Sequence, residues 1–105
     1  MRRILVSGGS VLTTNAIARQ LFLYASLLAD QQRTDVVDFP VSFEGEATNC
    51  TLLVGAHLTL TAVTVPRSEA GTLPGEDSAL FELQRRCDDA RTLTLPASSP
   101  RSMER

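Results

Sequence analysis

The sequence predicts an α+β protein: a two-layer sandwich in which two helices cover one face of a mainly antiparallel sheet of four to five strands. Two segments, residues 15–32 and 78–90, carry apolar residues at helical spacing. Between them, residues 34–65 largely alternate apolar and polar side chains, with the two-residue period of β-strands. With a short strand expected at each end, the predicted order of elements is β-α-β-β-β-α-β.

Length and composition limit the class of protein. A chain of 105 residues with 43% apolar residues predicts one domain over residues 1–95, followed by a disordered tail over 96–105. The formal charge of -2 gives no electrostatic reason to bind nucleic acid or an anionic membrane. All ten basic residues are arginine, a bias typical of GC-rich genomes, so a bacterial source is expected. No apolar segment resembles a signal-peptide core or a membrane span, which predicts a cytoplasmic location.

The first strand is predicted over residues 2–7, because three apolar residues follow one another at positions 4–6. Gly8 and Gly9 are then expected to turn the chain from this strand into a helix. The polar residues at 13–15 all suit an N-cap. If the first strand pairs in the middle of the sheet, the topology would approach the split β-α-β pattern of ferredoxin-like folds.

The first helix is predicted over residues 15–32. Its apolar stripe is made by Ile17, Leu21, Tyr24 and Leu28. Leu23 and Leu27 lie off this stripe, one helical turn apart from each other. Either a loop or the second helix covers them, or they contact another subunit. The second alternative makes both leucines candidate interface residues.

The middle of the chain predicts a three-stranded β-meander. Residues 34–43 and 47–54 alternate apolar and polar side chains on either side of a turn at 44–46. Pro40 cannot donate a backbone hydrogen bond, so its strand is expected at a sheet edge or with a bulge there. This position makes Pro40 a further candidate interface residue. The third strand is expected within residues 58–65, where the apolar phase slips by one residue, as a bulge would cause.

The C-terminal third predicts a loop, a helix and a last strand. Residues 66–76 contain two glycines and two prolines, which is typical of an exposed loop. A helix capped by Asp77 or Ser78 is expected to run to about residue 90. Its apolar stripe consists of Leu80, Leu83, Cys87 and Ala90, with Phe81 beside it. A short final strand is expected over residues 92–95.

The turn over residues 7–15 is the best candidate for a ligand site. A strand that turns directly into a helix start presents backbone N–H groups, here supplemented by hydroxyls, to an anion. The turn lacks the third glycine of a dinucleotide-binding motif and the lysine of a phosphate-binding loop. What remains is a generic phosphate or carboxylate site, unless the glycines serve only to reverse the chain. The candidate ligand-binding residues are Gly8, Gly9, Ser10, Thr13 and Thr14.

No catalytic residue, metal site or cofactor is expected. His57 is the only histidine, and neither Ser10 nor Cys50 occurs in the sequence context of an activated nucleophile. The acidic pairs flank a turn glycine or are neighbours on a helix, so they do not converge on one metal ion. Cys50 and Cys87 are far apart in sequence and are expected to be reduced thiols.

These observations predict a small non-enzymatic interaction or accessory module that associates with itself or with a small protein partner. The off-stripe leucines and the expected edge strand at Pro40 motivate this hypothesis. A subunit of a larger assembly would show the same features. The alternative function is a small-molecule binding protein or minor enzyme that holds an anion at the turn from Ser7 to Asn15.

Overall fold

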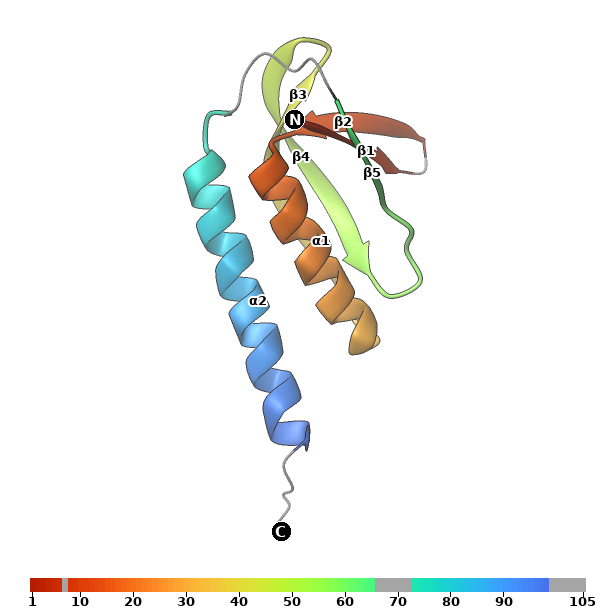
Figure 1. Cartoon of the computed structure of the whole chain (residues 1–105), viewed down its shortest axis with the longest axis vertical. Coiled ribbons are helices and arrows are strands. Elements are labelled where there is room, and N and C mark those ends of the chain that lie inside the picture. Colours follow the sequence, from red (N-terminus) through yellow and green to blue (C-terminus); the bar gives the residue numbers. More distant parts are fainter. Residues whose placement is uncertain (7, 66–72, 99–105) are drawn as a thin grey trace.

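The structure, a computed structural model, describes residues 1–6, 8–65 and 73–98, with side chains up to residue 92. It confirms the α+β class: five strands form one sheet in which every pairing is antiparallel, and two helices pack on one face (Figure 1). The strands lie in the order β4-β3-β2-β1-β5. In chain order the elements are β1 (Arg2–Val6), β2 (Gly9–Thr13), α1 (Asn15–Asp30), β3 (Thr34–Phe43), β4 (Glu46–Gly55), β5 (Thr61–Thr64) and α2 (Glu76–Ser98).

The expected strand-to-helix turn at the two glycines is wrong, because the chain forms a β-hairpin there. Gly9 begins β2, which pairs with β1 from Val6–Gly9 to Arg2–Thr13. Gly8 has a φ of +99°, the left-handed conformation that tight hairpin turns require. The element order is therefore β-β-α-β-β-β-α, and the helix start lies one full strand away from the glycines.

Thr14 caps α1, as the sequence predicts for one of the polar residues at 13–15. Its Oγ1 accepts a hydrogen bond from the backbone N–H of Ile17 at 3.2 Å. The predicted apolar stripe of this helix is buried in full. Leu27 packs against the core from the flank that faces α2, where Gln20 and Gln31 donate hydrogen bonds to Cys87 and to the Ala90 carbonyl. The second helix thus accounts for Leu27.

The hairpin of β3 and β4 has the predicted boundaries to within a residue or two, and its ten pairs run without a bulge. The expected three-stranded meander is wrong, because β5 pairs with β1 at the opposite edge of the sheet from β4. Residues 58–60 are not strand, so the slip in apolar phase marks the irregular segment before β5 rather than a bulge.

Pro40 lies neither at a sheet edge nor at a bulge, so both expectations for it are wrong. Its strand, β3, is the second of the sheet, and Pro40 is paired in register with Asn49. The missing N–H is tolerated because β2 pairs with β3 only at Leu12–Ser42. The Pro40 carbonyl points to the β2 side, where it accepts the Thr13 hydroxyl at 2.9 Å.

The second helix is longer than expected. It continues to Ser98, so the strand expected over residues 92–95 is wrong, and residues 96–98 of the expected tail are helical. Side-chain pairs at helical spacing join Glu82 to Arg85 and Arg86, and Arg85 to Asp89, which favours a continuous helix. Phe81 is 70% exposed instead of lying beside the core. Residues 66–72 of the expected loop and 99–105 of the expected tail lie outside the described residues.

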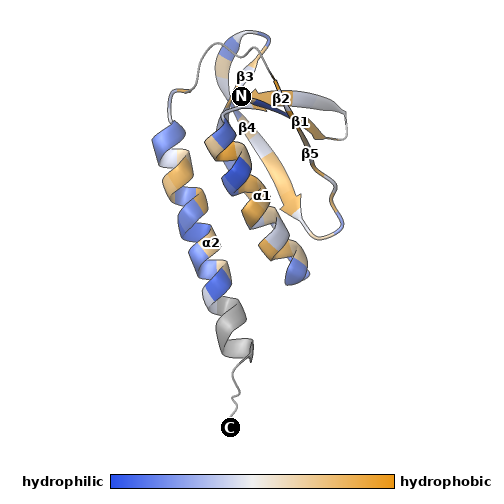
Figure 2. Cartoon of the chain, in the orientation of Figure 1, coloured by the Kyte–Doolittle hydropathy of each residue, from blue (hydrophilic) through white to orange (hydrophobic). Residues whose placement is uncertain are grey.

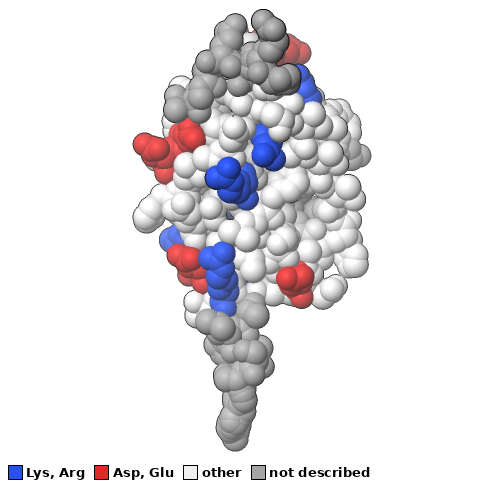
Figure 3. Space-filling model, in the orientation of Figure 1, with Lys and Arg blue, Asp and Glu red and all other residues white. Residues whose placement is uncertain are grey.

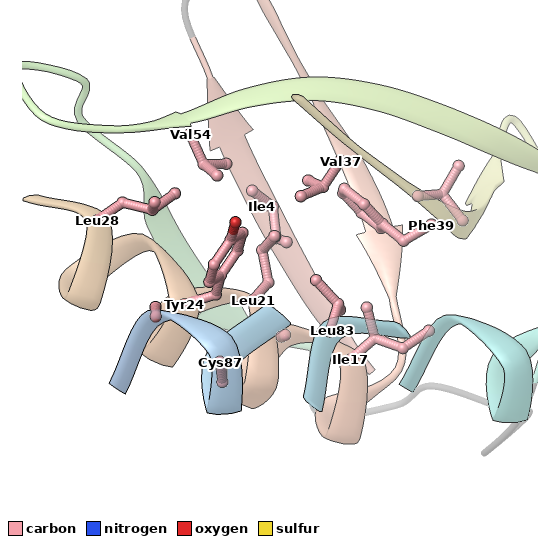
Figure 4. Close-up of a cluster of buried hydrophobic side chains, with 13 residues drawn as sticks. Ile4, Ile17, Leu21, Tyr24, Leu28, Val37, Phe39, Val54, Leu83 and Cys87 are labelled. Carbon is pink, nitrogen blue, oxygen red and sulfur yellow. The ribbon is translucent and has the colours of Figure 1, made fainter. Parts of the chain in front are cut away.

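The core lies between the helices and the inner face of the sheet (Figure 4). Phe39 is the largest of its fully buried side chains, and α2 contributes its Leu83 and Cys87. The remaining buried members are Ile4, Ile17, Ala18, Leu21, Tyr24, Leu28, Val37, Val41, Val54 and Ala90. Since alternate strand residues point to opposite faces, their neighbours in β1, β3 and β4 point away from the helices.

Replacing Gly55 with alanine should destabilise the protein strongly. Gly55 has a φ of +126°, and a Cβ there would lie 2.3 Å from the carbonyl oxygen of Arg33. We expect the free energy of unfolding in urea to fall by at least about 2 kcal/mol. Gly9→Ala is the matched control, because no heavy atom lies within 4 Å of its added Cβ. The control should change stability by less than about 0.5 kcal/mol. Equal effects of the two substitutions would contradict this account of the turn.

Candidate functional site

The structure does not bring the predicted anion-binding residues together. Gly8 and Gly9 lie at the hairpin turn, whereas Thr13 and Thr14 lie at the other end of β2, roughly 13 Å away along the strand. Ser10 accepts a hydrogen bond from Arg3 at 3.4 Å. A single ligand of phosphate size therefore cannot contact both ends of this segment.

The helix start that the sequence points to is occupied by protein groups. Thr13 and Thr14 are both buried. The Thr14 hydroxyl donates to Glu76 Oε2 at 3.0 Å and accepts from Ile17 N–H, while the Thr13 hydroxyl bonds to Pro40. A carboxylate of the chain itself thus lies where an external anion was expected.

The three predicted interface residues have different surroundings. Leu23 is 37% exposed on the outer side of α1. Leu27 packs against the core, and Pro40 is buried within the sheet. Only Leu23 therefore offers a partner a substantially exposed side chain.

A larger apolar surface, which sequence reasoning missed, covers the outer face of the sheet. No described element packs on this face, and Leu5, Val36, Leu53 and Val63 are all more than a third exposed there. Val36 and Leu53 are direct cross-strand partners in β3 and β4. Figure 2 shows the C-terminal half of β4 as a mostly hydrophobic stretch. The sequence did contain a sign of this surface: Val36 and Leu53 are apolar at positions where the alternation of their strands predicts polar residues.

An open hollow of about 660 Å³ adjoins this surface where the end of β4 approaches β1 and β5. Leu5, Leu53 and Leu58 line it together with His57, which is exposed and has a φ of +65°. The other polar side chains of its lining are the hydroxyls of Thr59 and Thr61. This lining suits contact with an apolar group.

The free edge of β4 is the second feature of this region. β4 is the first strand of the sheet and pairs only with β3 among the described residues. Ala56 N–H bonds to Arg33 O, and the Pro40 carbonyl points away from β4. Because backbone groups alternate along an antiparallel ladder, these two bonds show which β4 residues face outward. The N–H and C=O groups directed away from β3 belong to Ala47, Asn49, Thr51, Leu53 and Gly55.

A polar network ties the two helices to β3. The Tyr24 hydroxyl donates to Asp35 Oδ2 at 2.5 Å, and Arg86 Nη1 donates to the same oxygen at 3.0 Å and to the Val36 carbonyl at 2.8 Å. Burial, together with the bond to Asp35, raises the pKa of Tyr24 to about 12. Although desolvation by burial opposes it, hydrogen bonds from Tyr24 and Val36 and the charge of Arg86 lower the pKa of Asp35. Both groups are held in their ordinary charge states, which suits a structural tie.

The remaining reactive side chains do not cluster. Among the described residues no three His, Cys, Asp or Glu side chains come close enough to share a metal ion. Burial raises the pKa of both free thiols, Cys50 and Cys87, above the ordinary value. In the part of the chain that the structure describes, neither helix combines the length and apolar character needed to cross a bilayer.

Comparisons with known proteins add no relative. No protein-family model matches the chain, and no curated protein or solved structure is significantly similar to it.

The titration of Tyr24 tests the polar network. It is the only tyrosine of a chain without tryptophan, so the ultraviolet absorbance of tyrosinate reports on this residue alone. We expect a pKa of about 12 in the folded protein and about 10 in the unfolded chain. Because the folded value is the higher one, Tyr24 stabilises the fold below pH 10, and this contribution is lost as the pH rises towards 12.

Asp35→Asn should lower the folded pKa of Tyr24 towards 10 without reaching it, since burial persists. Asp38→Asn is the matched control, because Asp38 lies on the same strand but bonds to Thr51 instead. A Tyr24 pKa that does not respond to Asp35→Asn, or responds equally to Asp38→Asn, would refute the role given to Asp35.

Proposed function

We propose that this protein is a self-associating interaction module, in which two copies join through the free edge of β4 to make one continuous sheet. The observation that carries the proposal is a ten-residue edge strand whose outer side no other strand of the described residues covers. Natural sheets guard their edges with charged side chains, proline, bulges or very short strands. β4 has one charged residue, Glu46 at its start, and no proline or bulge.

The geometry of the edge favours a second copy of the chain as the partner. Two antiparallel copies of one strand always match in length around a two-fold axis. An axis through Thr51 would pair Asn49 with Leu53 of the partner subunit and Ala47 with Gly55 of the partner subunit. This register places the outward backbone groups of β4 opposite those of the partner. Among the described residues, the Gly55 carbonyl is the one of these groups that already accepts a hydrogen bond, from Leu58 N–H at 3.3 Å.

The outer face supports the same arrangement. Val36 and Leu53 lie at the β4 side of the sheet and are 50% and 48% exposed. Joining two sheets edge to edge would bring the apolar outer faces of both copies into one surface. Leu53 would then lie close to the new seam, where the partner's strand reduces its contact with water.

The location that fits this proposal is the cytoplasm of a bacterium. The arginine-only basic residues support a GC-rich genome as the source. The two unpaired thiols, Cys50 and Cys87, suit a reducing compartment.

Sedimentation velocity at micromolar concentration tests the association. The wild-type chain should sediment as a dimer. Thr51→Pro should weaken the dimer at least tenfold, because it removes an outward N–H from each copy at the centre of the interface. It should leave the fold intact, since the N–H of Thr51 takes no part in the ladder with β3.

Thr51→Ala is the matched control. It removes the same side chain, including its bond to Asp38, but keeps the backbone N–H. This variant should dimerise like the wild type, and circular dichroism should show both variants folded. A monomeric wild-type chain, or a Thr51→Pro variant that dimerises normally, would refute the proposal.

A further inference from the structure

A second hollow, of about 320 Å³, lies on the helix side of the sheet between α1 and β5. Two arginines line it: Arg2 from β1 and Arg19 from the second turn of α1. Phe22 forms part of its wall, and the remaining lining residues, Ala18 and Ala62, have small side chains that leave room above them. The hollow therefore combines two cationic groups with an aromatic ring.

The side chains of these two arginines have no partner among the described residues. Neither the Arg2 side chain nor the Arg19 side chain makes a hydrogen bond or an ion pair with a described residue, and Arg2 Nε is buried without an acceptor. Arg85, Arg86 and Arg91, in contrast, are all paired with acidic side chains. Figure 3 shows basic side chains over the N-terminal half of α1, with acidic ones on the neighbouring start of α2. Two guanidinium groups at one hollow repel each other unless an anion lies between them.

An apolar groove continues from the arginine hollow. Phe22 also lines a neighbouring hollow of about 200 Å³, whose wall includes Ala25 on α1 together with Leu58 and Leu60. No charged residue lines this second space. Since Phe22 borders both hollows, the groove is cationic at one end and apolar at the other.

We propose that this groove binds an amphiphilic oxyanion, a carboxylate or phosphate group that carries an apolar chain. Arg2 and Arg19 hold the oxyanion through charge-assisted hydrogen bonds, for which the guanidinium fork is well shaped. Arg2 Nε has no acceptor among the described residues, so no intramolecular hydrogen bond holds this guanidinium group away from a ligand. Phe22, Leu58 and Leu60 contact the apolar chain.

This site differs from the one expected at residues 7–15. No residue of that turn lines it, and the oxyanion is held by side-chain cations instead of by a helix start. Its arginine end lies beside β5, at the opposite edge of the sheet from β4, whereas Gly55 at the end of β4 lines its apolar end.

Isothermal titration calorimetry with octanoate, octyl phosphate, acetate and inorganic phosphate tests the site. The two octyl compounds should bind one per chain. Each methylene group that is buried should strengthen binding by roughly fourfold, so acetate and inorganic phosphate should bind much more weakly. The stronger of the two octyl compounds identifies the oxyanion that the arginines prefer. If neither octyl compound binds saturably, or if the short anions bind as tightly, the proposal is overturned.

Substitutions then locate the binding. Arg2→Gln and Arg19→Gln should each weaken octanoate or octyl phosphate at least tenfold. Arg3→Gln is the matched control, because it removes the same charge from the next residue, which points to the opposite face of β1 and contacts Ser10. Binding that falls equally in Arg3→Gln would reveal a general charge effect and overturn the assignment.

A substitution of Leu58 tests the apolar end of the groove. Leu58→Asn should weaken the octyl compounds severalfold and leave the affinity for acetate and inorganic phosphate unchanged. Leu58 is 42% exposed, so this substitution should not unfold the protein. Unchanged octyl binding in a folded Leu58→Asn variant would overturn the placement of the chain in the groove.

Discussion

A β-sheet has two faces, and the described part of this chain provides helices for only one of them. The inner face takes the whole apolar stripe of α1 and the buried side chains of α2, which together form the core. Within the part of the chain that the structure describes, no helix packs on the outer face. The exposed aliphatic residues of the outer face follow from this shortage of covering elements.

Within the covered layer, α1 is the central element. It packs against the sheet beneath it and against α2 on one flank, and its other flank borders the groove that holds Arg19 and Phe22. Tyr24 and Arg86 meet at Asp35, so the middle turns of both helices are fixed to one position of β3. These hydrogen bonds at the rim of the apolar core fix the orientation of the helices on the sheet, because hydrophobic packing alone is non-directional.

The elements with strong periodicity could be predicted from the sequence. The stripe of α1 and the alternation of β3 occur as expected, because each buries one regular face. α2 begins at Glu76, so Asp77 and Ser78 lie inside the helix, and the expectation that one of them caps it is wrong. The first hairpin was mistaken because Gly8 suits a strand-to-helix turn as well as a hairpin, and only long-range pairing decides between them. The same holds for β5, whose four residues gain their structure from β1, almost sixty positions earlier.

The candidate sites were harder to predict than the fold. Ser10, Thr13 and Thr14 are the right residue types for an anion site, but their hydroxyls are used within the protein. Arg2 and Arg19 are remote in sequence, and their approach depends on how α1 crosses β1. A single sequence also does not show which strand lies at the edge of the sheet. The unpaired backbone groups of β4 could therefore not be predicted.

The short β5 strand has a consequence for the dynamics of the domain. It is held by four residue pairs to β1 and by no other strand, while the chain on both sides of it is irregular or lies outside the described residues. Such a peripheral strand can detach without unfolding the rest. Leu60 and Ala62, in and beside β5, complete the groove, so a ligand held there would bind only the docked state. A ligand that binds only the docked state would raise the population of that state. Occupation of the groove would therefore slow hydrogen exchange in β1 and β5.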